Sequence, residues 1–470
     1  MAAVHDLTAL EQAGAVRRRE LSPVELTEHY LRRIERLGDV VGAYITVTPE
    51  LALHQARAAE RAVLDGPADL GPLHGVPVPV KDLNNVAGVR LTAGSAVVEV
   101  VPDLDDHVVI RLREGGTVCL GKTNTPEFGL PCYTENAVAP PARTPWDLTR
   151  SAGGSSGGAA AAVAAGLAPL AQGSDGGGSI RIPASVCGLV GIKPSRGRVS
   201  TGPLGYSVGD LGVQGPLART VRDAAALLDV MAGGFPGDPF EAPRPPEPFR
   251  AAADRDPGRL RVGRFRIPVI ADAEVHPDCV AAYERASELL ADLGHDVEDV
   301  APPFRSEVVP MFERVWSVLA LLNPIRPENE PRLRPLTRWL RDRGREVDGL
   351  GLAQAVSFMR QASRRAIAAS SSYDVVPTPT LAQPPALVGG IRDDADPAGD
   401  FARQKEFTPF TAPYNVTGQP AVSLPLHHTG GGLPVGVQLV GRPYGEATLI
   451  ALAAQLERAR PWLGRVPPVW

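Results

Sequence analysis

The chain has 470 residues, a formal net charge of −5 and a hydrophobic content of 44%. This content supplies a large buried core, so we predict a globular protein rather than a disordered one. The acidic balance provides no basic surface for nucleic acid or anionic membranes, and we expect neither as a partner.

The N-terminal residues 1–16 lack the basic start and unbroken apolar run of a signal peptide. No stretch of about 18 residues is free of the charges, prolines and glycines that a membrane span excludes. The four cysteines show no CxxC spacing, which favours reduced thiols and argues against a zinc site. We therefore expect a cytoplasmic protein without a metal or another cofactor.

Two helices are predicted before the first strands. The sequence Ser22-Pro23-Val24-Glu25 is a capping box with proline at the first helical position, and apolar residues follow on one helical face until Gly38. A second helix is expected near 50–65. Residues 76–80 and 117–120 are short and β-branched, and are predicted as buried strands separated by a helix. This strand–helix–strand order predicts a parallel sheet covered by helices.

The middle of the chain alternates between helices, strands and one break. An Ala-rich helix is predicted over 157–167, and strands over 167–172 and 185–193. The Pro- and Gly-rich stretch 233–260 predicts a surface linker. Beyond it the predicted elements are a strand at 260–265, a helix from Pro277 to Gly294, a mostly helical region at 305–372, strands at 373–380, 419–426 and 436–441, and a helix at 445–460. Because strands occur on both sides of the linker, we expect one mixed sheet and not two independent domains.

One motif suggests nucleotide binding. GTVCLGKT (116–123) matches the spacing of a phosphate-binding loop. Its variable residues form a strand-like run, however, and Pro126 and Pro131 argue against the helix that should begin at Lys122. We interpret Lys122 as a structural or surface lysine, and keep a nucleotide-binding protein built on this stretch as the alternative from another functional class.

Three features carry residues suited to acyl transfer. Lys81 lies near the carboxyl end of the first predicted strand, in PVPVKDLN. Ser155 and Ser156 lie between glycine pairs in SAGGSSGG, before the Ala-rich helix. The stretch GSDGGGSIRIP (173–183) places four glycines before Ser179. Because catalytic groups gather outside the carboxyl ends of parallel strands, the three features can converge there.

Each feature alone has an ordinary interpretation: a solvated lysine, an N-cap serine at 155 or 156, and an anion-binding turn. Together they supply what a serine nucleophile needs. Its hydroxyl requires a base, and a lysine can act as that base when burial lowers its pKa. An oxyanion hole requires converging backbone N–H groups, which are offered by the successive residues Gly176, Gly177, Gly178 and Ser179.

The chain resembles the amidase signature family in these residues and in several further segments. Lys81, GGSSGG (153–158) and GSDGGGSIRIP match the family's motifs, and the resemblance continues through GKTNTPE, PWDL, CGLVGIKPSRGRVS and GLPVGVQLVGRP. It covers most of the chain and implies a single α/β domain over residues 1–470. In that fold a mixed, mostly parallel β-sheet core is wrapped by α-helices on both faces.

Within this domain we expect four parts. They are an N-terminal helical segment (1–65), a core with the catalytic residues (66–232), the linker (233–260), and a C-terminal part (261–470) that completes the sheet and the substrate pocket. The oligomeric state stays open, with a homodimer as one option.

The resemblance also implies a Ser-cisSer-Lys triad. Ser179 would be the nucleophile that forms the acyl-enzyme, and Lys81 would be the base. Ser155 would follow a cis peptide bond and would bridge these two residues. The backbone N–H groups of residues 176–179 would bind the oxyanion. Supporting hydrogen bonds to the loops are expected from Ser156, Asp175 and Arg181. The loop reads D-G-G-G-S where D-T-G-G-S is commoner, so we expect Gly176 to loosen it or to make room for a bulkier acyl group.

The activity implied by the resemblance is hydrolysis of a carboxylic amide. The stretch after GKTNTPE would line an apolar acyl pocket through Leu130, Cys132 and Tyr133. RGRVSTGPLG resembles hydrolases of 6-aminohexanoate cyclic dimers, so we expect a small-molecule substrate: a linear or cyclic aliphatic amide, or an aryl acylamide. The alternative within the family is the glutaminase subunit of the tRNA-dependent amidotransferase, although that branch usually carries YGRVSR where this chain has RGRVST.

Overall fold

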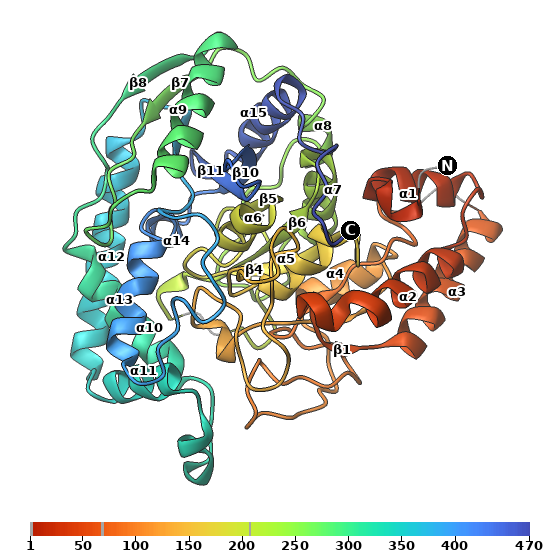
Figure 1. The fold of residues 1–470 in the computed structure, drawn as a ribbon, viewed down its shortest axis with the longest axis horizontal. Helices are drawn as coiled ribbons and strands as arrows, with labels where there is room; N and C mark the ends of the chain where they lie inside the picture. The colour runs from red at the N-terminus through yellow and green to blue at the C-terminus, as the bar shows by residue number, and fades with distance from the viewer. Residues whose placement is uncertain (1–2, 67–69, 206–207) are drawn as a thin grey trace.

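A mixed eight-stranded sheet forms the centre of the molecule in the computed structural model, which describes residues 3–66, 70–205 and 208–470 (Figure 1). Its strand order is β4-β6-β5-β10-β11-β9-β7-β8. The strands are β4 (Leu170–Asp175), β5 (Val190–Lys193), β6 (Val213–Ala218), β7 (Arg261–Arg264), β8 (Asp296–Asp299), β9 (Val375–Pro379), β10 (Ala421–His428) and β11 (Pro434–Gly441). The sheet takes strands from both sides of the linker, which confirms that part of the prediction.

The sheet is mixed, as predicted, but it is not mostly parallel. Every neighbouring pair from β4 through β6, β5, β10 and β11 to β9 is antiparallel, whereas β9–β7 and β7–β8 are parallel. For one of these pairs the reason is visible, because β10 and β11 are joined by a short hairpin over residues 429–433. Only antiparallel strands can be joined in this way. A strand signal in the sequence does not identify the partner strand, so the predicted pairing direction was wrong.

A second, three-stranded sheet lies beside β4. It consists of β1 (Tyr44–Val47), β3 (Gly121–Thr123) and β2 (Val80–Lys81), with β2 and β3 parallel as expected. The strands predicted at 76–80 and 117–120 are corrected: apart from Val80, they meet only at an isolated bridge between Pro77 and Val118. The Val78 N–H donates to the Val118 carbonyl and the Val118 N–H donates to the Val76 carbonyl, which makes a single bridge, and regular pairing begins only at Val80.

The two sheets meet at the strand that carries Lys81. The Gln172 backbone N–H in β4 donates to the Pro79 carbonyl, at 3.2 Å. This contact places β2 next to the edge of the large sheet. Lys81, the last residue of β2, therefore lies beside the end of β4.

The N-terminal helices follow the predicted start signals but not every predicted end. The Ser22 hydroxyl accepts from the N–H groups of Val24 and Glu25, so the capping box is confirmed. The helix that it begins continues through Gly38 and ends at Gly42, where φ is +60° and a Cβ would lie 2.2 Å from the Pro141 carbonyl oxygen. A glycine is tolerated within a helix, and only the later one adopts the left-handed cap. The helices here are α1 (Ala9–Arg17), α2 (Pro23–Val41) and α3 (Pro49–Asp65).

The remaining helices largely occupy the predicted ranges. One correction concerns 185–193, where the predicted strand is a helix end (α6) followed by β5. In Figure 1, helices α10 to α13 lie at the opposite end of the molecule from α1 to α3, with the large sheet between them. The helices are α4 (His107–Glu114), α5 (Gly157–Ala164), α6 (Arg181–Cys187), α7 (Val221–Met231), α8 (Phe249–Ala252), α9 (Pro277–Asp292), α10 (Val308–Leu321), α11 (Pro335–Arg345), α12 (Gly349–Ala369), α13 (Pro397–Phe407), α14 (Pro413–Thr417) and α15 (Glu446–Ala459), with short 3₁₀ turns at Val4–Asp6, Glu127–Gly129, Val208–Asp210 and Pro327–Arg332.

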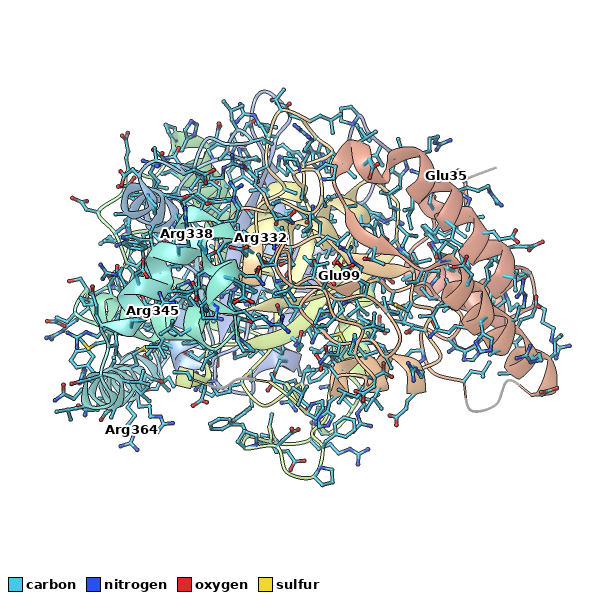
Figure 2. The ribbon with its side chains drawn as sticks, turned by 90° about the horizontal axis from the view of Figure 1, so that it is seen from below. Glu35, Glu99, Arg332, Arg338, Arg345 and Arg364 are labelled. Atoms are coloured by element: carbon cyan, nitrogen blue, oxygen red, sulfur yellow. The ribbon has the colours of Figure 1, made fainter. Side chains whose placement is uncertain are left out.

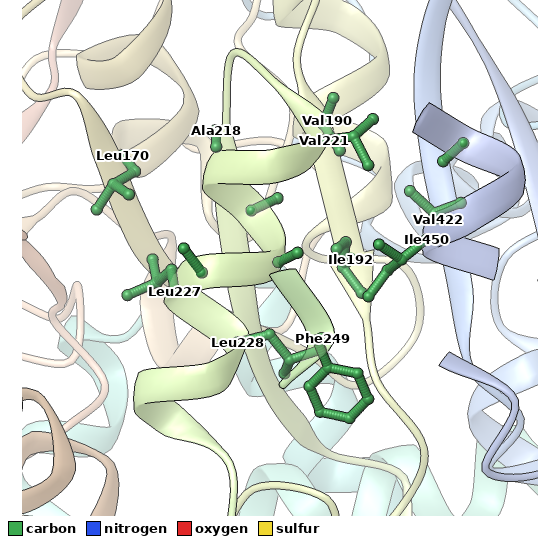
Figure 3. Packing of buried hydrophobic residues seen from close by; sticks show 14 of the residues in the cluster. Leu170, Val190, Ile192, Ala218, Val221, Leu227, Leu228, Phe249, Val422 and Ile450 are labelled. Atoms are coloured by element: carbon green, nitrogen blue, oxygen red, sulfur yellow. The ribbon is translucent and has the colours of Figure 1, made fainter. Parts of the chain in front are cut away.

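Adjacent residues of the large sheet enter two different hydrophobic cores. Leu170 and Ala218 pack with α7, α8 and α15, and Figure 3 shows Leu227 of α7 in this cluster. Ala171 and Leu217, the next residues along the same strands, pack with α5 and α6. Helices therefore cover both faces of the sheet, as predicted, because side chains alternate between the faces of a strand. Within the described ranges, no helix has the length and apolarity needed to cross a bilayer.

Candidate active site

Lys81 lies at the end of β2 with its side chain fully buried. Its Nζ donates to the Ser155 hydroxyl at 2.8 Å and to the Ser174 hydroxyl at 3.0 Å. Its backbone N–H donates to the side chain of Gln172, which fixes the strand at the junction of the two sheets. Burial lowers the pKa of the Lys81 amine to about 7, against the opposing attraction of the Asp175 carboxylate. A large fraction of this amine is therefore neutral near pH 7.

The loop that carries Ser155 is shaped by close backbone contacts. A Cβ at Gly154 would lie 2.8 Å from the Tyr133 backbone, and one at Gly158 would lie 2.3 Å from the backbone nitrogen of Asn124. These approaches exclude a side chain, so the glycines are required by packing. The Gly154–Ser155 peptide bond is cis, as the resemblance implied.

Neither serine of this loop caps a helix. Helix α5 begins after Ser156, whose side chain makes no capping hydrogen bond. Instead the Ser156 hydroxyl donates to the Ser174 carbonyl at 3.1 Å and accepts from the Ser174 N–H at 3.3 Å. The Ser156 N–H donates to the Ser179 carbonyl at 3.1 Å. The N-cap interpretation is therefore wrong, and these bonds join the two serine loops.

A buried ion pair organises the loop at 173–183. Arg181 Nη2 and Asp175 Oδ1 lie 2.9 Å apart, and both side chains are fully buried. The carboxylate also accepts from the N–H groups of Gly178 and Ile180. Burial opposes ionisation of Asp175, but the attraction and hydrogen bonds of Arg181 outweigh it and hold the pKa well below its usual range. The loop is therefore closed around a permanent carboxylate.

Distant parts of the chain complete this network. Arg181 also donates to the carbonyl of Thr411 and to the side chains of Gln438 and Asn415. The Asn415 amide donates in turn to the carbonyl and the carboxylate of Asp175. With the two hydrogen bonds to Asp175, the guanidinium makes five hydrogen bonds, which orient the residues on either side of it.

The predicted oxyanion cradle is corrected at one position. The Gly178 N–H donates to Asp175 at 2.8 Å, so it is not available to a substrate oxygen. This glycine has φ of +137°, and a Cβ there would lie 2.4 Å from Thr411 Oγ1. Among the described residues, none accepts from the N–H groups of Gly176, Gly177 or Ser179. These three groups are the candidate donors.

Gly176, the unusual glycine, lies against an aromatic ring. A Cβ at this position would be 3.4 Å from the ring of Trp316, and Gly177 is next to the same ring and to that of Phe312. The two rings are stacked at 5.3 Å on α10. The space that a larger residue would occupy at position 176 is therefore bordered by Trp316.

Ser179 borders a cavity of about 80 Å³. Leu130 and Cys132 line it, and their role in binding an acyl group stays a prediction. Tyr133 does not line it, which corrects the prediction: its hydroxyl donates to the buried Asp400 at 2.6 Å. The other lining residues come mainly from α10, α13 and the segment before β10, namely Val308, Phe312, Trp316, Phe401, Ala412 and Val416.

Sequence reasoning missed two groups of residues in this site. Ser174 lies inside a motif that had been singled out, and its alternation with Asp175 along β4 could have placed it beside Lys81. The residues of α10 and α13 carry no motif, because they come from a region that shows only helical periodicity.

Lys122 lies in strand β3 and forms a fully buried ion pair with Asp82 at 2.8 Å. It is therefore a structural lysine and not part of a phosphate loop.

Comparison with known proteins extends this description. A family model described as Amidase matches residues 25–450. The chain is 42% identical over 469 residues to the putative amidase AmiB2 of Mycobacterium tuberculosis, covering 98% of each chain. It is 36% identical to a glutamyl-tRNA(Gln) amidotransferase subunit of Moorella thermoacetica, again covering 98% of each. The solved structure of 6-aminohexanoate cyclic dimer hydrolase complexed with substrate is similar, with a TM-score of 0.90, 34% identity, and coverage of 99% of this chain and 100% of that one.

Proposed function

The chain belongs to the amidase signature family of carbon–nitrogen hydrolases, and from this premise we propose that it cleaves a small carboxylic amide through an acyl-enzyme on Ser179. The observation that carries the proposal is the 2.8 Å contact between Ser155 and the fully buried Lys81. A buried lysine of lowered pKa is a base that a neighbouring hydroxyl can reach.

The proposed reaction begins with attack of Ser179 Oγ on the amide carbonyl carbon. The Ser179 proton passes to Ser155 while the Ser155 proton passes to Lys81 Nζ, so the lysine becomes an ammonium. The carbonyl oxygen becomes an oxyanion and accepts from the free N–H groups of the loop at 176–179. The carbon–nitrogen bond then breaks as the proton returns by the same route to the leaving amine.

The second half of the reaction restores the enzyme. A water molecule attacks the acyl carbon and gives up a proton toward Lys81 through Ser155. The bond from the acyl carbon to Ser179 then breaks, and Ser179 regains its proton as the carboxylic acid leaves. The fixed dipoles of the loop stabilise both tetrahedral intermediates, which is the principal electrostatic contribution in this chemistry.

The cavity supports an apolar acyl or amine portion of modest size. Its walls near Ser179 are formed by Leu130, Ile182, Phe312 and Trp316. We propose a linear or cyclic aliphatic amide, or an aryl acylamide, since flat rings and methylene chains both fit between such walls. Similarity to the cyclic dimer hydrolase supports the aliphatic class.

The proposal is tested with a panel of amides on the purified chain. Hexanamide, a cyclic oligoamide and an acetanilide are expected to be hydrolysed without any partner protein, with release of ammonia or amine as the readout. Turnover of glutamine that requires added partner subunits, without turnover of the other amides, would instead support a glutaminase subunit. That second candidate is favoured by the full-length similarity to the amidotransferase subunit.

The rate is expected to depend on pH through Lys81. The pKa of its amine is about 7, and the neutral form is the base. Below this pH, kcat/KM for hexanamide should rise about tenfold for each pH unit, and it should level off above it. The measurement is kcat/KM between about pH 5.5 and 9.

A matched control separates this lysine from a second one. Burial lowers the pKa of Lys193 to about 7 as well, but its Nζ donates to the Pro194 carbonyl and to neither serine. A folded Lys193→Met variant should keep the inflection. A wild-type profile that is flat from about pH 6 to 8, or that falls, contradicts the role of Lys81.

A further inference from the structure

Lysine is used sparingly in this chain. Only four of its 48 basic side chains are lysine. Lys81, Lys122 and Lys193 are fully buried, and the exposed positive charges are arginines, such as Arg345 and Arg364 on α11 and α12 (Figure 2). The fourth lysine, Lys405, differs from the other three because its side chain is only partly buried.

Lys405 lies in the wall of the cavity that contains Ser179. It belongs to α13, its side chain is 28% exposed, and its Nζ is 5.5 Å from the centre of the Phe401 ring in the same wall. Within this mostly apolar lining it provides an ammonium on a flexible stem. Arginine, which has a rigid planar head, would not provide the same point charge.

The charges around Lys405 do not cancel. Its Nζ is 2.7 Å from Glu313 Oε1 on α10, and Arg343 Nη2 on α11 is 3.9 Å from the other oxygen of the same carboxylate. Among the described residues, Glu313 is the acidic group within ion-pair distance of either cation. Two positive charges thus share one negative charge at the wall of the cavity.

We propose that Lys405 is a specificity residue that binds a carboxylate carried by the substrate, several methylene groups away from the scissile amide. This inference rests on the proposed amide hydrolysis. When the carboxylate enters, Lys405 leaves Glu313 for it, and Glu313 keeps Arg343 as its partner. No carboxylate is then left without a counter-charge, which is the condition for exchanging partners at a partly buried site. The apolar walls hold the methylene chain between the two ends.

A structural role makes a different prediction. If the Lys405–Glu313 pair only ties α13 to α10, its loss affects all substrates equally. We therefore compare amides that differ only in a distal charge: adipamate with hexanamide, and N-acetyl-6-aminohexanoate with N-hexylacetamide. The first pair carries the carboxylate on the acyl side and the second carries it on the amine side.

The expected result concerns a ratio of kcat/KM values. Lys405→Met should lower the ratio of charged to neutral substrate by about 10- to 100-fold for at least one pair, because a charge-assisted hydrogen bond is lost. Lys405→Arg should recover part of the preference, and Glu313→Gln should increase it by freeing the ammonium. Arg364→Met, which removes an exposed charge on α12, is the matched control and should leave the ratio as in the wild type.

Three outcomes decide the matter. A lowered ratio for one pair supports the proposal and identifies the side of the amide that carries the carboxylate. Equal losses on charged and neutral substrates, or a wild type that hydrolyses only the neutral amides, overturn it while leaving amide hydrolysis intact. Failure of the wild type on every substrate contradicts the proposed function itself.

A second readout does not depend on turnover. The other three lysines are fully buried, so an amine-reactive ester should modify Lys405 and the terminal amine selectively. Adipate, the expected product, should slow the modification of Lys405, as measured by peptide mass spectrometry, whereas hexan-1-ol should not. Equal rates with both additives contradict carboxylate binding at this position.

Discussion

Ser179→Ala is expected to abolish amide hydrolysis, with a loss of roughly 10⁴-fold or more in kcat, and to abolish labelling by a fluorophosphonate. In the proposed mechanism this residue supplies the oxygen that forms the covalent intermediate, and the remaining groups of the site would not replace it. In the described part of the chain no group hydrogen-bonds the Ser179 hydroxyl, which borders the cavity. The free energy of unfolding should therefore change by no more than about 1 kcal/mol.

The control for this variant is another serine of the same chain. Ser371 lies exposed in the turn after α12, and its hydroxyl donates to the Ala368 carbonyl. Ser371→Ala should retain both activity and labelling. Full-rate labelling of Ser179→Ala would show that the nucleophile is a different residue.

Lys81→Met is expected to lower kcat/KM for amides by about three orders of magnitude or more. The substitution keeps an unbranched, flexible stem but removes the amine to which Ser155 can pass a proton. The substitution removes a buried amine that has no carboxylate partner, which favours folding, but it leaves the hydroxyl groups of Ser155 and Ser174 without this donor. The free energy of unfolding should therefore fall by at most about 1–3 kcal/mol. Thermal unfolding measured beside the kinetics checks both expectations.

An activated ester distinguishes a base from a merely structural lysine. The nitrophenolate of a p-nitrophenyl ester leaves without needing a proton, so the loss in Lys81→Met should be smaller for the ester than for the amide. Equal losses on both substrates would indicate that the variant has a distorted site. Amide turnover close to that of the wild type would refute the lysine-base mechanism.

The motifs predicted that Lys81 approaches Ser155, and their glycines indicate where backbone segments pack closely. The glycines at 154 and 158 are there because backbone atoms of Tyr133 and Asn124 lie within 3 Å of where a Cβ would be. These glycines are visible in the motif although the atoms that require them lie elsewhere in the chain, and the approach of Lys81 to Ser155 was expected from the carboxyl ends of the predicted strands. The cap at Ser22 was predictable because its partners are only two and three residues away.

The predictions for Gly178, Tyr133 and the strand directions were wrong because each depends on a partner that the sequence does not identify. Gly178 looks like its neighbours in the sequence, and only the position of the Asp175 carboxylate decides that its N–H is already bound. Tyr133 is apolar in bulk, but its hydroxyl finds Asp400, 267 residues later. The direction of strand pairing could not be predicted either, because the alternation of apolar and polar residues shows which face of a strand is buried but not which strand lies next to it.

The contacts of Arg181 have a consequence for how the protein is made. The groups that hold this side chain, the Thr411 carbonyl, Gln438 and Asn415, follow it by 230 to 257 residues. On the ribosome, the loop that carries Ser179 is synthesised long before the segment that completes its support. A nascent chain that has not yet emerged past Gln438 therefore lacks groups that hold Arg181 in the folded protein. Under the proposed function, we expect hydrolysis only after these later segments have joined the loop, and not when the motifs alone have been synthesised.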